Sequence, residues 1–364
     1  MTRLWHSRSW SAILLVLAAA GVGLLRAVYC FSVPLYTTDL LRNLGFGKAF
    51  HIWGFGVYDL TPPDFSPWPI QFLWPHHHYT YPAVTLLFYA GVTVISTSMA
   101  FAKCVLTLLD VLGTWLIYRV TRDRWTALLY WINPLGIWYV SREGQFEALA
   151  GLVMILALHE LRREKPWALG LLSLAVQTKL FPVFLLPYFL TRLSWRDPKR
   201  LARECAWGAA GWLPSLAAGL FSGYLIHLFE PGYIPQVNPI SWRLHDPMQF
   251  YTYPYWLPVA HAGVSLVFLA LCLYGMEKQQ RVVEFLAPLA FLVFVKSILI
   301  GQFWYVTLLP AFCLPVEDTK WRRWLFAACL LFGARELHSI FIGPIGYQNP
   351  PDVMSLLEKA FGGF

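Results

Sequence analysis

Charge is the property this sequence has least of. Asp, Glu, Lys and Arg make up 13% of its 364 residues, and hydrophobic residues make up 57%. A soluble domain of this length would carry about twice that charged fraction. The composition therefore excludes an ordinary soluble globular domain and predicts an all-α, polytopic membrane protein.

Several chemical signatures are also missing. The sequence has no Walker loop, no Rossmann glycine fingerprint and no G-x-S-x-G elbow. Energy for any reaction must therefore come from an activated lipid-linked donor or from a gradient. The six cysteines stand singly in apolar runs without C-x-x-C spacing, which favours packed thiols over disulfides or metal ligands.

Long uninterrupted apolar runs are scarce as well. We count about eleven or twelve apolar segments, and most fall short of the ~20 residues that a straight span needs, so several are expected to be short, tilted or broken helices. The first segment favours an uncleaved span over a signal peptide. No second domain is visible in residues 1–364. The predicted segments are 11–33, 82–98, 100–118, 125–140, 145–161, 167–178, 181–192, 204–222, 254–275, 282–299, 301–315 and 324–342.

The net charge of +8 is concentrated in a few basic turns, which the positive-inside rule predicts to be cytoplasmic. Two long polar stretches with few Lys or Arg, 34–81 and 223–253, are predicted to be extracytoplasmic loops. Both are rich in proline and aromatic residues, which suits structured loops on the membrane surface. The basic turn at 119–124 creates a conflict, because 82–98 and 100–118 cannot then both cross the membrane fully.

Ionisable residues in or beside apolar runs carry the functional information, because each needs a partner or a wet cavity. A structural ion pair is the alternative for any one of them. Lys103 and Asp110 lie seven residues apart on one helix face and are predicted to serve helix packing. Lys179 precedes Pro182, where the helix is predicted to break. On the predicted topology, six of these residues gather toward the outer face: Asp39, Arg142, Glu143, Glu147, Lys179 and Lys296.

Three stretches carry a family resemblance: AFAKCVLTLLDVLGTWLIYR (100–119), NPLGIWYVSREGQFEALAGLVMILALHEL (133–161) and SLAVQTKLFPVFLLPYFL (173–190). They resemble the polyprenol-phosphate-mannose-dependent mannosyltransferases of the GT-C class, among them the catalytic subunit of glycosylphosphatidylinositol mannosyltransferase I. The resemblance implies a GT-C fold. The matching positions are Asn133, Pro134, Leu135, Ser141, Arg142, Gly144 and Glu147, then Lys179 to Pro182, and Lys296, Gln302, Trp304 and Tyr305.

The resemblance also implies roles for particular residues. Asp39 would be the general base that deprotonates the attacking hydroxyl. Three cations would bind the donor phosphate: Lys179, Arg142 and Lys296. Sugar or acceptor binding is expected of Glu147, Gln145, Asp59, Tyr81, His245, Gln302 and Tyr305.

Metal binding is where the sequence departs from the family. The family's first outer loop carries an Asp-x-Asp-like pair, whereas this chain has Thr37, Thr38 and Asp39, so only the second acidic position is filled. The first expectation is that no cofactor is required, with a divalent metal as the open alternative.

The resemblance predicts an inverting glycosyltransferase in the cell membrane, multi-pass, with its active site on the extracytoplasmic face. It would move a sugar, mannose before arabinofuranose or glucose, from a polyprenyl-phosphate donor to a lipid or lipid-linked glycan acceptor. A small membrane partner subunit is a further expectation, and nucleic acid is not an expected partner. The alternatives are a secondary transporter or flippase, which would show two similar halves, and a non-catalytic subunit of a glycan assembly complex.

Overall fold

The structure is a computed structural model of the chain that describes residues 2–34, 38–65, 78–79, 81–224, 284, 287–288, 290–291 and 307–342. Helices dominate this part of the chain, and no β-strand occurs in it. The predicted all-α class is therefore confirmed.

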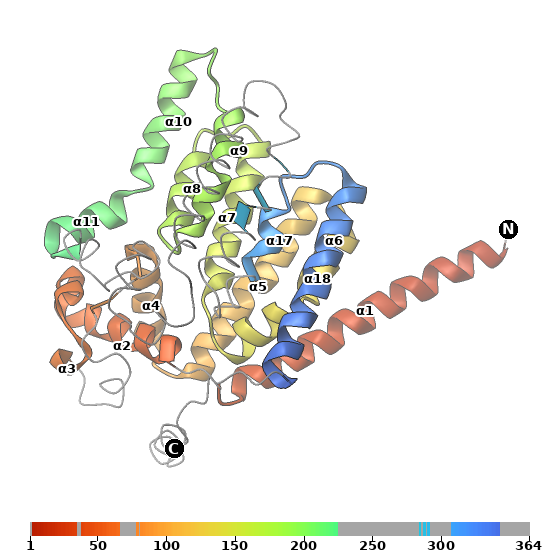
Figure 1. Cartoon of the computed structure of the whole chain (residues 1–364), viewed down its shortest axis with the longest axis horizontal. Helices are drawn as coiled ribbons and strands as arrows, with labels where there is room; N and C mark the ends of the chain where they lie inside the picture. The colour runs from red at the N-terminus through yellow and green to blue at the C-terminus, as the bar shows by residue number, and fades with distance from the viewer. Residues whose placement is uncertain are drawn as a thin grey trace, which may run out of the picture.

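Figure 1 shows the arrangement of the helical elements. In chain order they are α1 (Thr2–Phe31), α2 (Thr38–Trp53), η1 (Gly54–Asp59), α3 (Pro62–Phe65), α4 (Ala83–Ile95), α5 (Met99–Thr121), α6 (Arg124–Trp131), the π-helix η3 (Gly136–Arg142), α7 (Glu147–Arg162), α8 (Ala168–Val176), η4 (Phe181–Leu185), α9 (Leu186–Thr191), α10 (Pro198–Ala210), α11 (Leu213–Phe221), α17 (Leu309–Phe312) and α18 (Thr319–Ile342).

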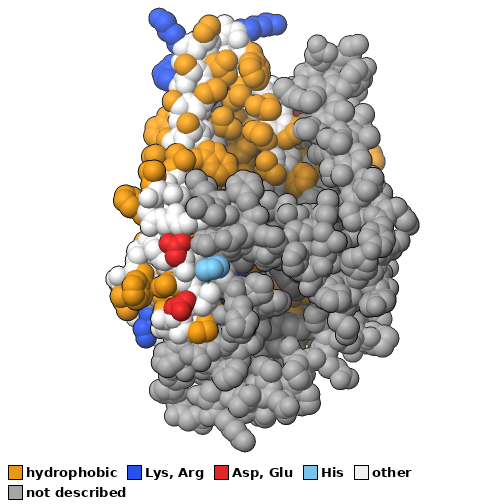
Figure 2. All heavy atoms as spheres, turned by 60° about the vertical axis from the view of Figure 1, so that its left-hand side comes forward, with side chains coloured by type: hydrophobic (Ala, Val, Ile, Leu, Met, Phe, Trp, Pro, Cys, Tyr) orange, Lys and Arg blue, Asp and Glu red, His pale blue; other side chains and the backbone are white. Residues whose placement is uncertain are grey.

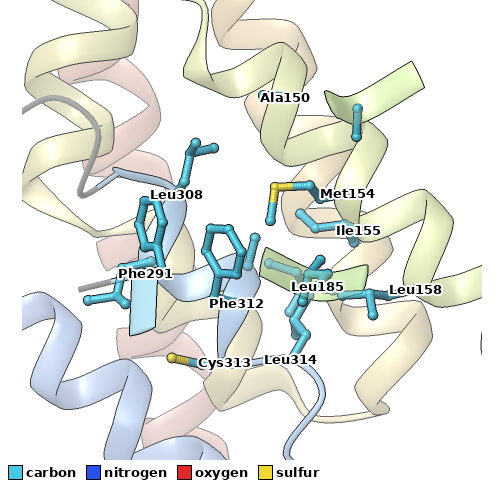
Figure 3. Close-up of a cluster of buried hydrophobic side chains, with 14 of the residues drawn as sticks. Ala150, Met154, Ile155, Leu158, Leu185, Phe291, Leu308, Phe312, Cys313 and Leu314 are labelled. Atoms are coloured by element: carbon cyan, nitrogen blue, oxygen red, sulfur yellow. The ribbon is translucent and has the colours of Figure 1, made fainter. Parts of the chain in front are cut away.

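The main core lies around α7, which packs against α5 on one side and α8 on another; α6 packs against α5, and α18 packs against α6 (Figure 1). Figure 3 shows its centre, where Met154 of α7 faces Leu185 and the aromatic rings of Phe291 and Phe312. Those two rings stack with centroids 4.2 Å apart. Distant segments are thereby held together by apolar burial, which supplies about 25 cal/mol per Å² of surface removed from water.

A second core joins α2 to α4 and carries the predicted outer loop. Gly47 permits the close approach of these helices, because a Cβ there would lie 2.6 Å from the carbonyl carbon of Tyr89. Beside it, Tyr58 donates a 2.9 Å hydrogen bond to the carbonyl of Tyr81. The part of 34–81 that the structure describes thus contains α2, η1 and α3, whereas most of 223–253 lies outside the described residues.

The helix lengths bear on the conflict between the predicted segments 82–98 and 100–118, which cannot both cross the membrane fully. At about 1.5 Å per residue α5 is about 34 Å long and α4 only about 20 Å, less than the ~30 Å hydrocarbon core. In the described residues α5 alone is long and apolar enough to span a membrane, and η3 with α7 would make a second span if that pair, bent by 118°, counts as one. Shorter apolar helices there are Val16–Phe31, Ala83–Ile95 and Phe181–Thr191.

Two breaks in predicted segments have local causes. The apolar segment 125–140 is one of the broken ones: α6 ends at Trp131, and Asn133 caps the next turn by accepting a 3.0 Å hydrogen bond from the Leu135 amide. Pro134 cannot donate a backbone hydrogen bond, so the first helix cannot continue. The predicted break at Lys179 is confirmed, since α8 ends at Val176 and η4 begins at Phe181.

Lys103 and Asp110 both face α1, in agreement with their predicted packing role. Asp110 accepts a hydrogen bond from fully buried Arg26 at 2.7 Å and another from Tyr130 at 2.6 Å. The ammonium of Lys103 donates to the carbonyl oxygens of Tyr29 and Ser32 at the end of α1. Each buried charge therefore has polar partners, as a low-dielectric interior requires.

Figure 2 shows how side-chain types separate along one face of the molecule: basic groups stand at one end, and an apolar region follows. Helix α11 exposes the apolar side chains of Leu213, Leu216, Leu220 and Phe221. An exposed apolar helix next to basic residues is typical of a surface in contact with lipid.

Candidate active site

Seven predicted site residues fall in the described part of the chain. They are Asp39, Asp59, Tyr81, Arg142, Gln145, Glu147 and Lys179. The other four, His245, Lys296, Gln302 and Tyr305, lie outside the described residues.

A sharp turn between η3 and α7 presents two polar side chains to the site. In η3 the amide of Glu143 bonds to the carbonyl of Trp138 at 3.0 Å, five residues back, which is π-helical spacing. Gly144 then adopts φ = +72°, a left-handed conformation that glycine tolerates best. This reversal places Gln145 and Glu147 at the start of α7.

Gly144 also brings α2 close to this turn. A Cβ at Gly144 would lie 2.6 Å from a methyl carbon of Leu40 and 3.0 Å from Cγ of Lys103. Asp39, in the first turn of α2, consequently meets the turn: Nε2 of Gln145 donates to Oδ2 of Asp39 at 3.4 Å. The predicted base is thus oriented by an amide from a segment 106 residues away.

Lys179 pairs with Glu147. Nζ of Lys179 donates to Oε1 of Glu147, and both side chains are at least 95% buried. The ammonium lies 4.5 Å from the ring centroid of Phe146 and 5.9 Å from that of Tyr81. Asp39 is close enough to both charged partners to interact with them electrostatically. The cluster therefore holds two carboxylates, one ammonium and two aromatic rings.

Two hydrogen-bond acceptors in the cluster have no donor among the described residues. Oε2 of Glu147 and Oε1 of Gln145 are buried, and neither accepts a hydrogen bond from any residue that the structure describes. Buried polar atoms are normally paired, and an unpaired one costs about 1 to 3 kcal/mol. A ligand with hydroxyl groups would satisfy both.

Arg142 has partners of its own, because Glu147 is paired with Lys179. The guanidinium of Arg142 instead stacks on Trp138 at 4.0 Å from the ring centroid, and its Nε lies 3.7 Å from Oε1 of Glu143. Its side chain keeps 21% of its surface exposed. The guanidinium is therefore partly accessible rather than fully buried.

Asp59 joins two segments of the outer region. Its Oδ1 accepts a 2.7 Å hydrogen bond from the amide of Gly223, just after α11. The preceding Tyr58 holds the carbonyl of Tyr81, and the Tyr81 ring packs edge-on against Phe146 with centroids 4.7 Å apart. Asp59 thus connects to the cluster through neighbouring side chains.

Three contributors were not recognised as site residues in the sequence. Phe146 was missed because a phenylalanine in an apolar stretch resembles core packing. Arg26 was missed although it is a charged residue in the first apolar segment. Charged residues in apolar segments were the signal by which the other candidates were chosen. Lys103 was assigned to packing alone, but it also donates to the carbonyl of Arg142 at 3.2 Å and so supports η3.

No group of three or more His, Cys, Asp or Glu side chains placed to hold a metal ion occurs among the residues described. Metal dependence stays a prediction.

Comparisons with known proteins agree with the resemblance. The chain matches GPI mannosyltransferase 1 of Gibberella zeae at 28% identity over 201 residues, covering 49% of this chain and 45% of the relative. The match thus spans about half the length of that relative. No solved structure matches the chain.

The sequence model of Glycosyltransferase family 87 matches residues 79–301, more than half of the 364 residues. This stretch includes the Gly144 turn and the Lys179–Glu147 pair. The predicted resemblance to mannosyltransferases is confirmed by the two matches together. The chain belongs to glycosyltransferase family 87.

Proposed function

We propose that this glycosyltransferase moves a mannosyl group from a polyprenyl-phosphate donor to a hydroxyl of a lipid or lipid-linked glycan, inverting the anomeric configuration. The observation that carries the proposal is the convergence of Asp39, Gln145 and the buried Lys179–Glu147 pair in one cluster. The name of the fungal relative supports mannose as the sugar.

Asp39 is the proposed base. Its carboxylate takes the proton of the acceptor hydroxyl as that oxygen forms a bond to the anomeric carbon. The carbon–oxygen bond to the donor phosphate breaks in the same displacement, and its electron pair leaves with the phosphate. Attack opposite the leaving group converts a β-linked donor into an α-mannoside. Gln145 positions the base through its 3.4 Å hydrogen bond.

Lys179 is the proposed partner of the departing phosphate, on which negative charge grows as the bond breaks. Its pairing with Glu147 favours the charged form of the ammonium in a buried place. The partly exposed guanidinium of Arg142 is a second candidate and can bind phosphate oxygens in a fork. Lys296 remains a predicted third cation.

Sugar recognition is assigned to the unpaired acceptors and the rings. Sugar hydroxyls can donate to Oε2 of Glu147 and Oε1 of Gln145, which have no partner in the described structure. Tyr81 and Phe146 offer apolar surface to a sugar face. Asp59, His245, Gln302 and Tyr305 are proposed to complete recognition of the sugar or acceptor.

We place the reaction at the extracytoplasmic face of a multi-pass membrane protein with a GT-C fold. Three features support this assignment: helix α5 is long enough to span a membrane, α11 exposes apolar side chains, and the basic residues are concentrated in a few turns. The active site then opens where a lipid-linked donor and a lipid acceptor can both diffuse to it. The predicted small partner subunit would be an additional component.

The test is transfer of labelled mannose by the purified full chain from polyprenyl-phosphate mannose to candidate lipid acceptors. Asp39→Asn should lower kcat by about 10² to 10⁴-fold, because it removes the base but keeps the side-chain size. Digestion of the product by an α-mannosidase tests inversion. Wild-type turnover in Asp39→Asn would exclude the base assignment.

Asp64→Asn is the matched control. Asp64 is exposed, and its Oδ2 accepts hydrogen bonds from the amide and hydroxyl of Thr61 at 2.6 and 2.8 Å. These bonds hold the pKa of the Asp64 carboxyl below its ordinary value. This acidic group lies outside the cluster, so its neutralisation should leave kcat unchanged.

A further inference from the structure

A second polar cavity lies at the end of the helix bundle far from the candidate site. It has a volume of about 630 Å³ and is formed by the C-terminal ends of α5 and α7, the segment after α9, and the first turns of α10 and α18. Helix α7 separates the two places, because Glu147 begins it and Arg162 ends it. At 1.5 Å per residue they are about 22 Å apart along the axis.

Arginines dominate the lining of this cavity: Arg162, Arg192, Arg200 and Arg322 contribute to it, against Glu164 and Glu317. Glu284 and Glu204, which lie against Arg192 and Arg200, bring the carboxylates around these four arginines to four, so the position of each charge decides what the cavity can bind. A cavity lined by guanidinium groups raises the local concentration of anions.

Two of the four arginines are neutralised by carboxylates. Arg192 pairs with Glu317, and Glu284 lies 3.9 Å from it. Arg200 lies 3.3 Å from Glu164 and 3.2 Å from Glu204. The positive charges of Arg192 and Arg200 are therefore compensated by carboxylates and are not available to bind an anionic ligand.

The other two arginines, Arg162 and Arg322, are held by uncharged groups instead. Arg162 donates to the carbonyl oxygens of Val120 and Leu314, at 3.3 and 2.7 Å. Arg322 is 3% exposed and donates to the carbonyls of Val316 and Glu317. Neither has a carboxylate within 4.0 Å among the ion pairs of the described residues, and Nε of Arg322 has no hydrogen-bond partner there. Carbonyls satisfy donors but do not cancel the charge.

An apolar groove of about 600 Å³ adjoins this cavity and shares Thr319 with it. Its lining includes Trp125, Leu129 and Trp324, and the two indoles are 38% and 64% exposed. A charged cavity beside an exposed apolar groove matches a molecule with a phosphate at one end and an acyl chain at the other. Tryptophans at such a boundary are typical of the membrane interface.

We propose that the cavity lined by Arg162 and Arg322 binds a phosphate anion, and that the adjoining groove favours an anionic phospholipid as its source. Guanidinium groups bind phosphate oxygens in a fork. The inference does not depend on the transfer chemistry, because the cavity lies at the opposite end of α7 from the cluster.

The test introduces a carboxylate without removing an arginine. Thr319 is exposed in the first turn of α18, where a negative charge favours the helix. Thr319→Glu should therefore fold, while its charge competes with phosphate for Arg322. Thr319→Glu removes one 3.3 Å hydrogen bond from Arg322 to the Thr319 hydroxyl, whereas Arg162→Gln breaks two, to the carbonyls of Val120 and Leu314, and removes the positive charge as well. Ala202→Glu, on an exposed position of α10 outside the cavity, makes the same charge change as a control.

Thermal unfolding of the purified full chain would be followed with three probes: short-chain phosphatidylglycerol, short-chain phosphatidylcholine and inorganic phosphate. Phosphatidylglycerol at 100 times its Kd should raise the Tm of the wild type and of Ala202→Glu by about 5 °C. Thr319→Glu should bind it about tenfold more weakly or worse.

The probes separate the two sources of phosphate. Equal stabilisation by inorganic phosphate, also lost in Thr319→Glu, would support the anion site and identify its ligand as free phosphate. A response to phosphatidylglycerol alone would support the lipid. Three outcomes would overturn the proposal: no response to either anion, an unchanged response in Thr319→Glu, or equal stabilisation by phosphatidylcholine.

Discussion

The two ends of α7 differ in the polar groups that are buried there and in the partners of those groups. At the Glu147 end, two buried acceptor oxygens, of Glu147 and Gln145, have no partner in the described structure. At the Arg162 end, carbonyl oxygens rather than carboxylates hold Arg162 and Arg322. One helix thus connects a place suited to hydroxyl groups with a place suited to an anion.

The difference shows that residue type alone does not indicate a ligand. Both ends combine acidic and basic side chains, yet Lys179 at one end is paired with Glu147, while Arg162 and Arg322 at the other have carbonyl oxygens as partners. The helix dipole favours this orientation, with Glu147 at the N-terminus of α7 and Arg162 at its C-terminus. The following predictions test each end separately.

The largest effect is expected from breaking the buried pair. Lys179→Met leaves the carboxylate of Glu147 buried without its partner, which should cost about 3 to 5 kcal/mol of stability. The double variant Lys179→Met with Glu147→Gln should recover most of that loss but remain inactive, because the phosphate still lacks its ammonium. Thermal unfolding and mannose transfer measure the two quantities.

Lys48→Met is the control for this pair, since it makes the same substitution at an exposed position of α2. It should change neither stability nor transfer. A double variant with wild-type activity would contradict the phosphate-binding role of Lys179. A single variant as stable as the wild type would contradict the burial of the pair.

An intermediate effect is expected at the turn before α7. Gly144→Ala combines a left-handed backbone with an overlap against Leu40, so a loss of about 2 to 4 kcal/mol should result. It should also lower kcat, because displacement of Leu40 moves the adjacent Asp39. Gly54→Ala provides the comparison: its φ is +54°, but no atom lies within 4 Å of the added Cβ. If both variants lose stability and kcat equally, steric contact at Gly144 does not position the base.

The smallest effect is expected at the basic end. Nε and Nη2 of Arg323 each donate a 2.7 Å hydrogen bond to the carboxylate of Asp123. Burial alone would raise the pKa of the Asp123 carboxyl, but Arg323, the hydroxyl of Thr126 and the amide of Trp125 together lower it below its ordinary value. Asp123→Asn keeps an N-cap acceptor and should cost about 1 kcal/mol at neutral pH.

The lowered pKa also sets the pH dependence. The contribution of Asp123 to stability is fully present above the ordinary carboxyl pKa of about 3.9 and is lost as the pH falls toward the lower folded-state value. The stability difference between wild type and Asp123→Asn should therefore shrink below about pH 4. The control Asp318→Asn keeps the cap of α18 without losing an ion pair. A difference that grows on acidification would contradict the ion pair.

Much of the candidate site could be predicted from the sequence where the relevant residues are local. The break at Lys179 followed from Pro182, and Gln145 and Glu147 followed from the motif around Gly144. The helical class followed from composition. Arg142 was harder, since its actual partner is the ring of Trp138 and no local pattern distinguishes that contact from a carboxylate partner.

The sequence by itself determined that buried charges exist and which of them flank helix breaks, because burial cost and proline chemistry act over a few residues. Only the tertiary structure decided which charges meet: Asp39 reaches Gln145, Lys179 reaches Glu147, and the arginines gather at the far end of α7. Those pairings depend on the close approach of separate helices at glycines such as Gly47 and Gly144. That approach is set by packing between segments far apart in the chain, and no local pattern encodes it.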